Sequence, residues 1–192
     1  MKRIFILTIL LILVASICYA GTPLKTYKNT DFQFEISYPH EWTILVTSPK
    51  LNKFIFGKHV GDLIVTISPT KGWRYMGVIT NHALNITSND PYSDEILDDL
   101  ITRSLDFPLG GIAPKFVSKS LVTINDMKAM QLISRIPRGY IRGKSPELLD
   151  ETYFIYHNNY WYEISFGGTA EEFKTNRQLF DESLKSFKFL LE

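Results

Sequence analysis

The sequence is almost free of cysteine, because its single cysteine, Cys18, lies inside the apolar N-terminal segment. One cysteine cannot form an internal disulfide, and no thiol after residue 18 can act as a nucleophile or a metal ligand. A charge excess is lacking as well, since 21 basic residues stand against 20 acidic ones. Nucleic-acid-binding proteins normally carry a clear basic excess. We therefore expect no nucleic-acid partner.

Catalytic and metal-binding motifs are also absent from the sequence. There is no G-x-S-x-G elbow, no glycine-rich phosphate loop and no HExxH or HxH spacing. The four histidines, His40, His59, His82 and His157, fall in different predicted elements, whereas zinc sites usually take two ligands from one short motif. We expect no metal, no cofactor, no catalytic residue and a protein that is not an enzyme. The alternative is a hydrolase whose site is assembled from scattered His, Asp and Glu residues.

The N-terminus has the pattern of an export signal. Lys2 and Arg3 precede an uncharged apolar run, and Ala20 is a small residue at the expected cleavage point. We expect residues 1–20 to be removed and residues 21–192 to form one domain, in the periplasm or outside the cell. Two alternatives stay open: a retained membrane anchor, because the run approaches the length of a bilayer span, and lipidation at Cys18. Membrane contact is expected only through this segment.

Alternating apolar residues predict the first strands. Residues 32–38 alternate apolar and polar side chains, which indicates a strand with one buried face. Pro39 cannot donate a ladder hydrogen bond and should end this strand, and the pattern resumes at Trp42. His40 and Glu41 are adjacent, so we interpret them as an exposed turn rather than a catalytic pair.

Further strands are predicted at residues 53–56, 63–68, 116–124, 128–136, 152–157 and 160–166. Asn125-Asp126 and Asn158-Asn159 are two-residue turn signals between the last two pairs, because Asn tolerates positive φ. Residues 71–88 carry no clear period and are predicted to form an irregular loop. This order of hairpins favours a mostly antiparallel sheet.

Two helices are predicted beside these strands. Asn89, Asp90 and Pro91 form a helix start, followed by an apolar stripe at helical spacing that should end near Pro108. Thr169 and Glu172 have the spacing of a capping box, and a stripe of apolar residues continues to residue 187. Strands in hairpins with interposed helices define the α+β class.

The two ends of the domain together resemble the PsbP-like family and its exported bacterial relatives. The residues that carry the resemblance are Tyr38-Pro39 and Trp42 near the start, the tyrosine-rich hairpin at 153–166, and Ser186-Phe187 after the closing helix. The resemblance implies a six- or seven-stranded antiparallel sheet between helices, an α/β/α sandwich. It implies no catalytic site. Plant members are extrinsic subunits of photosystem II, and a distant relative binds a nuclear-transport GTPase, so the implied role is binding or assembly.

Two stretches are candidate binding surfaces. Residues 135–144 contain four cations and no acid, namely Arg135, Arg138, Arg142 and Lys144, together with Tyr140. Such a stretch suits an anionic partner: a lipid headgroup, an acidic protein patch or a polyanionic envelope polymer. The alternative is a long loop kept soluble by its charge. The second stretch is Trp73, Arg74 and Tyr75, residue types that dominate interface energetics, although Trp73 could equally be buried.

These patterns predict a non-enzymatic, exported protein that binds or helps to assemble an unknown protein or an anionic component of the cell envelope. Besides the hydrolase, a membrane-tethered sensor domain remains an alternative, which a retained N-terminal segment would favour. The sequence does not identify the partner.

Overall fold

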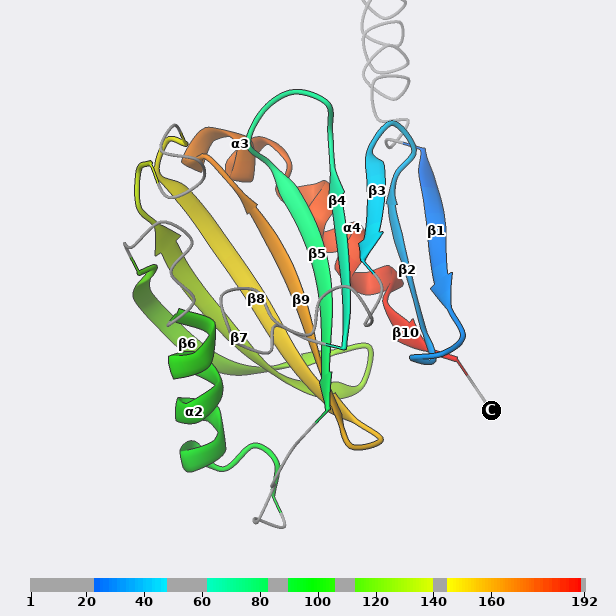
Figure 1. Cartoon of the computed structure of the whole chain (residues 1–192), viewed down its shortest axis with the longest axis vertical. Helices are drawn as coiled ribbons and strands as arrows, with labels where there is room; N and C mark the ends of the chain where they lie inside the picture. The colour runs from blue at the N-terminus through cyan, green and yellow to red at the C-terminus, as the bar shows by residue number, and fades with distance from the viewer. Residues whose placement is uncertain (1–22, 48–61, 83–89, 106–112, 140–144, 191–192) are drawn as a thin grey trace, which may run out of the picture.

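The computed structural model describes residues 23–47, 62–82, 90–105, 113–139 and 145–190. Within these residues the chain forms two antiparallel sheets and three helices (Figure 1). The larger sheet has the strand order β3-β4-β5-β9-β8-β7-β6, and the smaller sheet has the order β1-β2-β10. The strands are β1 (Leu24–Asn29), β2 (Phe34–Pro39), β3 (Thr43–Thr47), β4 (Leu63–Ser68), β5 (Tyr75–His82), β6 (Lys115–Ile124), β7 (Met127–Ile136), β8 (Leu148–His157), β9 (Tyr160–Gly168) and β10 (Lys188–Phe189).

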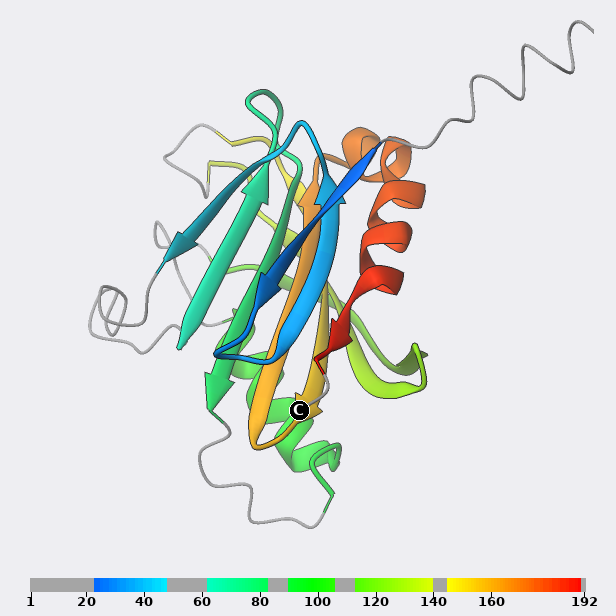
Figure 2. The same cartoon turned by 90° about the vertical axis from the view of Figure 1, so that its right-hand side faces the viewer.

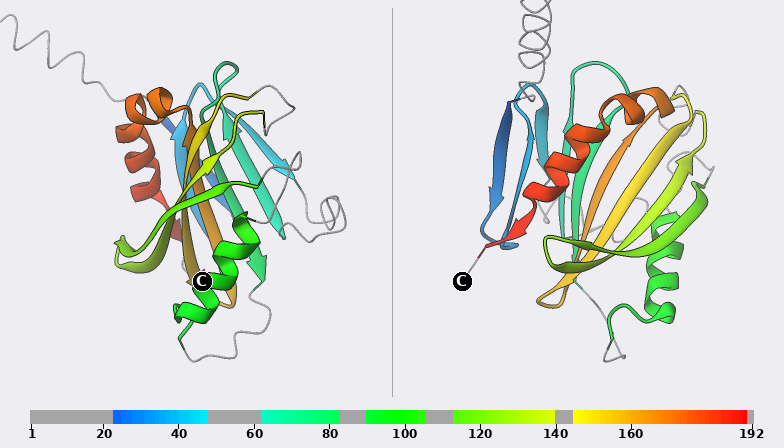
Figure 3. Two further views of the ribbon diagram at one scale, coloured as in Figure 1. Left: turned by 90° about the vertical axis from the view of Figure 1, so that its left-hand side faces the viewer. Right: turned by 180° about the vertical axis from the view of Figure 1, so that it is seen from behind.

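Helices lie on both faces of the larger sheet. The helix α2 (Asp94–Leu105) packs on one face, whereas α4 (Arg177–Ser186) and the smaller sheet lie on the opposite face (Figures 2 and 3). The short helix α3 (Ala170–Thr175) precedes α4. This arrangement confirms the predicted α+β class with a seven-stranded antiparallel sheet between helices. The separate small sheet was not predicted, because β1 has no fully buried residue and β10 is only two residues long.

The strand β2 forms as its alternation predicts and links the two sheets. Phe34 and Ile36 are buried, whereas Glu35 and Ser37 between them are half-buried. The strand ends at Pro39, whose carbonyl accepts a hydrogen bond from the Trp42 N–H at 3.0 Å and so closes a turn. The next strand, β3, belongs to the larger sheet. The β2–β3 turn therefore carries the chain from one sheet to the other.

The main core lies between the two sheets and α4. The Phe34 ring stacks on Phe187, with centroids 5.8 Å apart, and meets Tyr162 edge-on at 6.0 Å. Tyr162 also donates a hydrogen bond to the Phe32 carbonyl at 2.9 Å. Because Phe187 directly follows α4, these contacts hold the helix and the small sheet against the large one. A second cluster of apolar side chains lies under α2 and includes Leu97, Leu100, Ile101, Met130, Leu132, Phe154 and Trp161.

The two predicted hairpin turns are confirmed by their backbone geometry. Asn125 and Asp126 have φ angles of 47° and 66°, and Asn158 and Asn159 have φ angles of 47° and 62°. All four residues lie in the left-handed region, which the type I′ turn requires. Asn125 also donates two side-chain hydrogen bonds, at 2.7 and 3.0 Å, to carbonyls at the end of α4, so this turn is tied to the helix.

The prediction of an irregular loop over residues 71–88 is wrong for its middle part. Residues Tyr75–His82 form β5, which lies in the larger sheet between β4 and β9. Met76 and Val78 are buried on the core side, as is the polar Thr80, and Gly77 lies between them on the other face. Because a glycine and a buried threonine interrupt the alternation of apolar and polar residues, the sequence pattern did not indicate this strand. The strand predicted at 53–56 lies outside the described residues.

The closing helix is divided in two. The predicted capping box is present, because the Thr169 hydroxyl accepts from the Glu172 N–H at 3.2 Å and the Glu172 carboxylate accepts from the Thr169 N–H at 3.1 Å. The first helix then ends at Asn176, whose side chain donates to the Glu172 carbonyl at 2.7 Å. An asparagine side chain that bonds a nearby backbone carbonyl in this way competes with the helical hydrogen bonds and favours the end of a helix. No helix in the described part of the chain is long and apolar enough to cross a bilayer.

An ion pair between a buried carboxylate and a partly exposed guanidinium fastens α4 to the sheet. Glu151, only 2% exposed on β8, accepts hydrogen bonds from Gln131, from the Tyr153 hydroxyl at 2.6 Å and from Arg177 at the start of α4. Arg177 also contacts Asp181, with 2.9 Å between the guanidinium and the carboxylate. Burial, together with the neighbouring Glu151 carboxylate, raises the pKa of Tyr153 to about 12. With three donors, the buried Glu151 carboxylate has the several hydrogen bonds that a buried charge requires.

Candidate functional site: the loop end of the large sheet

The two candidate surfaces predicted from the sequence meet at one end of the larger sheet. Tyr75, at the start of β5, packs against Ile136 and Leu148, which flank the connection between β7 and β8. The guanidinium of Arg74 lies 5.7 Å from the centre of the Trp42 ring, in the β2–β3 turn. Three connections that are distant in sequence are thus neighbours, at the top of Figure 1. We call this region the loop end.

Trp73 is an exposed aromatic residue of the loop end. Its side chain is 36% exposed, and its backbone N–H donates to Glu172 at 2.9 Å. Gly72, with φ of +92°, allows the chain to pass close to this carboxylate, because a Cβ there would lie 2.4 Å from it. Burial opposes ionisation of Glu172, but the hydrogen bonds from Trp73 and Thr169 outweigh it and lower the pKa of this carboxyl group. The backbone under Trp73 is therefore held by a charged acceptor.

Arg74 and Tyr75 have mainly packing roles. The Arg74 guanidinium covers the buried Trp42 ring, and within the described part of the chain its Nε atom has no hydrogen-bond partner. The Tyr75 hydroxyl donates to Asp150, and its ring lies so close to Gly167 that a Cβ there would be 2.3 Å from the ring. Of the three predicted residues, only Trp73 offers a large exposed surface.

The predicted basic stretch is partly neutralised. Arg135 is exposed at the end of β7 but forms an ion pair with Glu147 at 3.2 Å. Arg138 is exposed, and Gly139 closes the chain beside it by donating to the Ser145 carbonyl at 2.7 Å. Tyr140, Arg142 and Lys144 lie outside the described residues. The acid that neutralises Arg135 stands just beyond the stretch considered in the sequence, which is why the stretch alone suggested more free charge.

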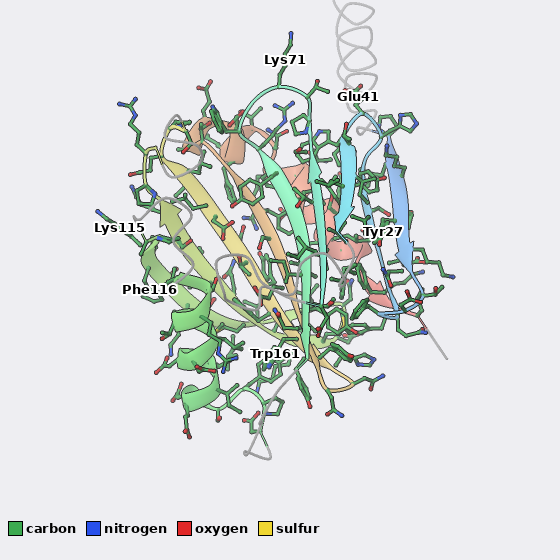
Figure 4. The ribbon with its side chains drawn as sticks, viewed as in Figure 1. Tyr27, Glu41, Lys71, Lys115, Phe116 and Trp161 are labelled. Atoms are coloured by element: carbon green, nitrogen blue, oxygen red, sulfur yellow. The ribbon has the colours of Figure 1, made fainter. Side chains whose placement is uncertain are left out.

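Lys71 adds a cation to the loop end that the sequence did not single out. Its side chain is exposed and points away from the sheet at the β4–β5 connection (Figure 4). Among the described residues, the ion pairs do not involve Lys71 or Arg138. Glu41 provides an exposed acid at the same end. The loop end therefore combines an exposed tryptophan with two exposed cations that form no ion pair with the described residues.

The two histidine side chains that the structure describes, His40 and His157, do not lie in a catalytic or metal-binding cluster. His40 is exposed on the β2–β3 turn, and its N–H donates to the Pro23 carbonyl at 2.8 Å. The His157 ring stacks on Phe189, with centroids 3.8 Å apart. His59 and the side chain of His82 lie outside the described residues. No group of three potential metal ligands occurs among the side chains that the structure describes.

A polar strip on the α2 face of the sheet is not indicated by the sequence motifs. It includes two carboxyl groups on neighbouring strands, Asp150 on β8 and Glu163 on β9. Asp150 accepts from the Tyr75 hydroxyl and from the Thr152 hydroxyl at 2.9 Å. Glu163 accepts from the Asn81 side chain at 2.6 Å. The available signal was an acidic residue inside an otherwise apolar strand, which marks a carboxyl group that must be satisfied within the sheet.

The pKa of each of these two carboxyl groups is raised above its ordinary value. Burial raises the pKa of Asp150, and the hydrogen bonds from Tyr75 and Thr152 only partly oppose this effect. Burial, with a contribution from the Asp150 charge, raises the pKa of Glu163 from 4.5 to about 7, against the opposing effects of Asn81 and Arg103. Glu163 can therefore hold or release a proton near neutral pH. Catalysis would also need a reacting partner within hydrogen-bond reach of this group.

Replacing Glu163 by glutamine should change how stability depends on pH. A folded-state pKa raised above the unfolded value means that the native protein binds more protons between pH 4.5 and about 7. The stabilising contribution is thus complete at low pH and is lost as the pH rises through 7. Urea unfolding should show that Glu163→Gln matches the wild type near pH 4.5 and exceeds it at pH 8, by roughly 1 to 3 kcal/mol. If the free energy of unfolding depends on pH in the same way in both proteins, the raised pKa of Glu163 is contradicted.

Comparison with known proteins identifies the fold. The sequence matches no protein-family model and no curated protein. The solved structure of the cyanobacterial PsbP protein CyanoP, from Synechocystis sp., is similar with a TM-score of 0.61 and 15% sequence identity, over 89% of this chain and 95% of that one. The Ran-binding protein Mog1p of Saccharomyces cerevisiae is similar with a TM-score of 0.52 and 8% identity, over 88% and 97% of the two chains. The chain therefore has a PsbP-like fold, as its sequence motifs predicted, and at these identities the similarity establishes the fold alone.

Proposed function

We propose that the protein is a non-enzymatic binding protein, exported to the cell envelope, and that its loop end recognises an acidic partner protein there. The observation that carries the proposal is that the exposed Trp73 and the exposed cations Lys71 and Arg138 lie on connections at the same end of the larger sheet. Export rests on the N-terminal sequence pattern. The fold supports a binding role, because one protein with a similar fold is described as Ran-binding.

The loop end has the features of residues that contribute strongly to binding free energy. Trp73 provides a large apolar area, and tryptophan is among the residues that most often dominate binding energy. Its backbone is fixed by Glu172 in the free protein, so less conformational entropy is lost on binding. Lys71 and Arg138 would attract an acidic surface and raise the association rate. A basic surface would be disfavoured by the same two charges.

Reversing these two charges should weaken capture of the partner. In a pull-down from a native envelope extract, Lys71→Glu/Arg138→Glu should recover roughly tenfold less partner than the wild type, because attraction becomes repulsion. The matched control is Lys28→Glu/Lys185→Glu, which reverses two exposed lysines on β1 and α4. Equal recovery by the two double variants would remove the loop end from the proposal. Raising the salt concentration should reduce recovery by the wild type in the same direction.

A further inference from the structure

The strand β6 forms an open edge of the larger sheet. It pairs with β7 along one side, and within the described part of the chain no strand pairs with its other side. Figure 3 shows β6 at the rim of the sheet. An edge strand presents a row of N–H and C=O groups that can bind another extended chain. With ten residues, β6 is long enough to act as such a template.

Apolar side chains on β6 are unusually exposed. Phe116 is 50% exposed, Val117 46% and Leu121 53%, and these are three of the seven large hydrophobic residues that are exposed among the described residues. Phe116 and Leu121 lie opposite Ser134 and Met130 of β7, which places both on the α2 face. A strand added beside β6 would cover these side chains through cross-strand pairs.

The usual devices that protect a sheet edge are weak here. The strand contains no proline, and a register shift between Phe116 and Ser118 affects only its first part. Lys119 could act as a charged guard, but its ammonium group is bound to Asp98 of α2 at 2.5 Å. The outer side of β6 is therefore open along both paired stretches, residues 115–116 and 118–124, on either side of the register shift.

The charge of β6 selects the kind of strand that fits. The strand carries Lys115 and Lys119 and has no acidic residue. Lys115 lies opposite Arg135 of β7 and extends away from the sheet (Figure 4). A second copy of β6 would bring no carboxylate to Lys115, and a lysine placed across from it would be unfavourable. A segment with acidic residues would instead meet opposite charges.

We propose that β6 binds an extended segment of a partner protein in which acidic residues alternate with apolar ones. The segment would add a strand to the seven-stranded sheet, with its apolar residues beside Phe116 and Leu121 and its carboxylates near Lys115. The backbone bonds would supply affinity, and the alternation would supply specificity. This site lies along the side of the sheet and does not depend on Trp73.

The test uses a fluorescent peptide of about eight residues that alternates Glu and Val, measured by fluorescence anisotropy. Two companion peptides carry Lys in place of Glu, or N-methyl groups that remove backbone donors. The proposal expects the acidic peptide to bind and both companions to bind at least about tenfold more weakly. Leu121→Lys should weaken binding to a similar extent, whereas Leu45→Lys, at an equally apolar and 63% exposed position on the opposite edge strand β3, should not.

Three results would overturn the proposal. Equal binding of the N-methylated peptide would mean that no strand is added, and equal binding of the lysine peptide would remove the charge argument. Sedimentation of the protein alone is the third measurement. A dimer that Leu121→Lys dissociates would assign β6 to a second copy of this chain. Because Leu121 is exposed, its variants should fold normally, which circular dichroism would verify.

Discussion

Replacing Arg177 by methionine should lower the free energy of unfolding by about 3 kcal/mol. The substitution removes the one cation that pairs with Glu151 among the described residues and leaves a buried carboxylate with only Gln131 and Tyr153 as donors. Methionine keeps much of the aliphatic volume, so lost packing contributes little. Urea denaturation near neutral pH would measure the change.

The control for this prediction is Lys174→Met, which removes an exposed cation from α3 and should change stability by less than about 0.5 kcal/mol. The double variant Glu151→Gln/Arg177→Met offers a second comparison. It should recover a large part of the loss, because the amide retains a hydrogen-bond acceptor without a buried charge. If Arg177→Met is no more destabilising than Lys174→Met, the ion pair does not hold α4 to the sheet.

Local signals in the sequence predicted local structure well. The alternation through Phe34 and Ile36, the stop at Pro39, the two asparagine turns and the capping box at Thr169 are all present. Each depends on residues that are at most a few positions apart. The ends of strands are local in the same way, because a proline or a left-handed turn stops strand pairing at its own position.

The structure differs from the prediction where contacts between residues distant in sequence determine the local structure. The strand β5 was missed because β4 and β9 supply its partners, and its own sequence contains Gly77 and the buried Thr80. Glu163 and Asn81 are 82 positions apart and become neighbours only when β9 pairs with β5. No periodicity in a single strand reports that order.

The candidate site shows the same division. The sequence identified Trp73 and Arg138 by residue type, but it could not show that their connections lie at one end of the sheet. Nor could it distinguish the exposed Trp73 from Tyr75, whose ring lies over Gly167 and whose hydroxyl is bound to Asp150. Arg135 and Glu147 pair because the β7–β8 connection brings its two ends together, which the sequence does not show. Residue type suggested candidates, and the strand order selected among them.

The central claim, that the loop end binds a partner, is tested most directly by a photo-cross-linking phenylalanine derivative placed at Trp73. This position is exposed and lies on a backbone held by Glu172, so a bound partner would be within reach of the probe. In native envelope extract we expect one discrete adduct, at least about ten times more intense than from the same probe at Leu45, an exposed apolar position on β3. Mass spectrometry should identify an acidic protein in it. Equal labelling from the two positions, or a smear without a discrete adduct at position 73, would contradict the account.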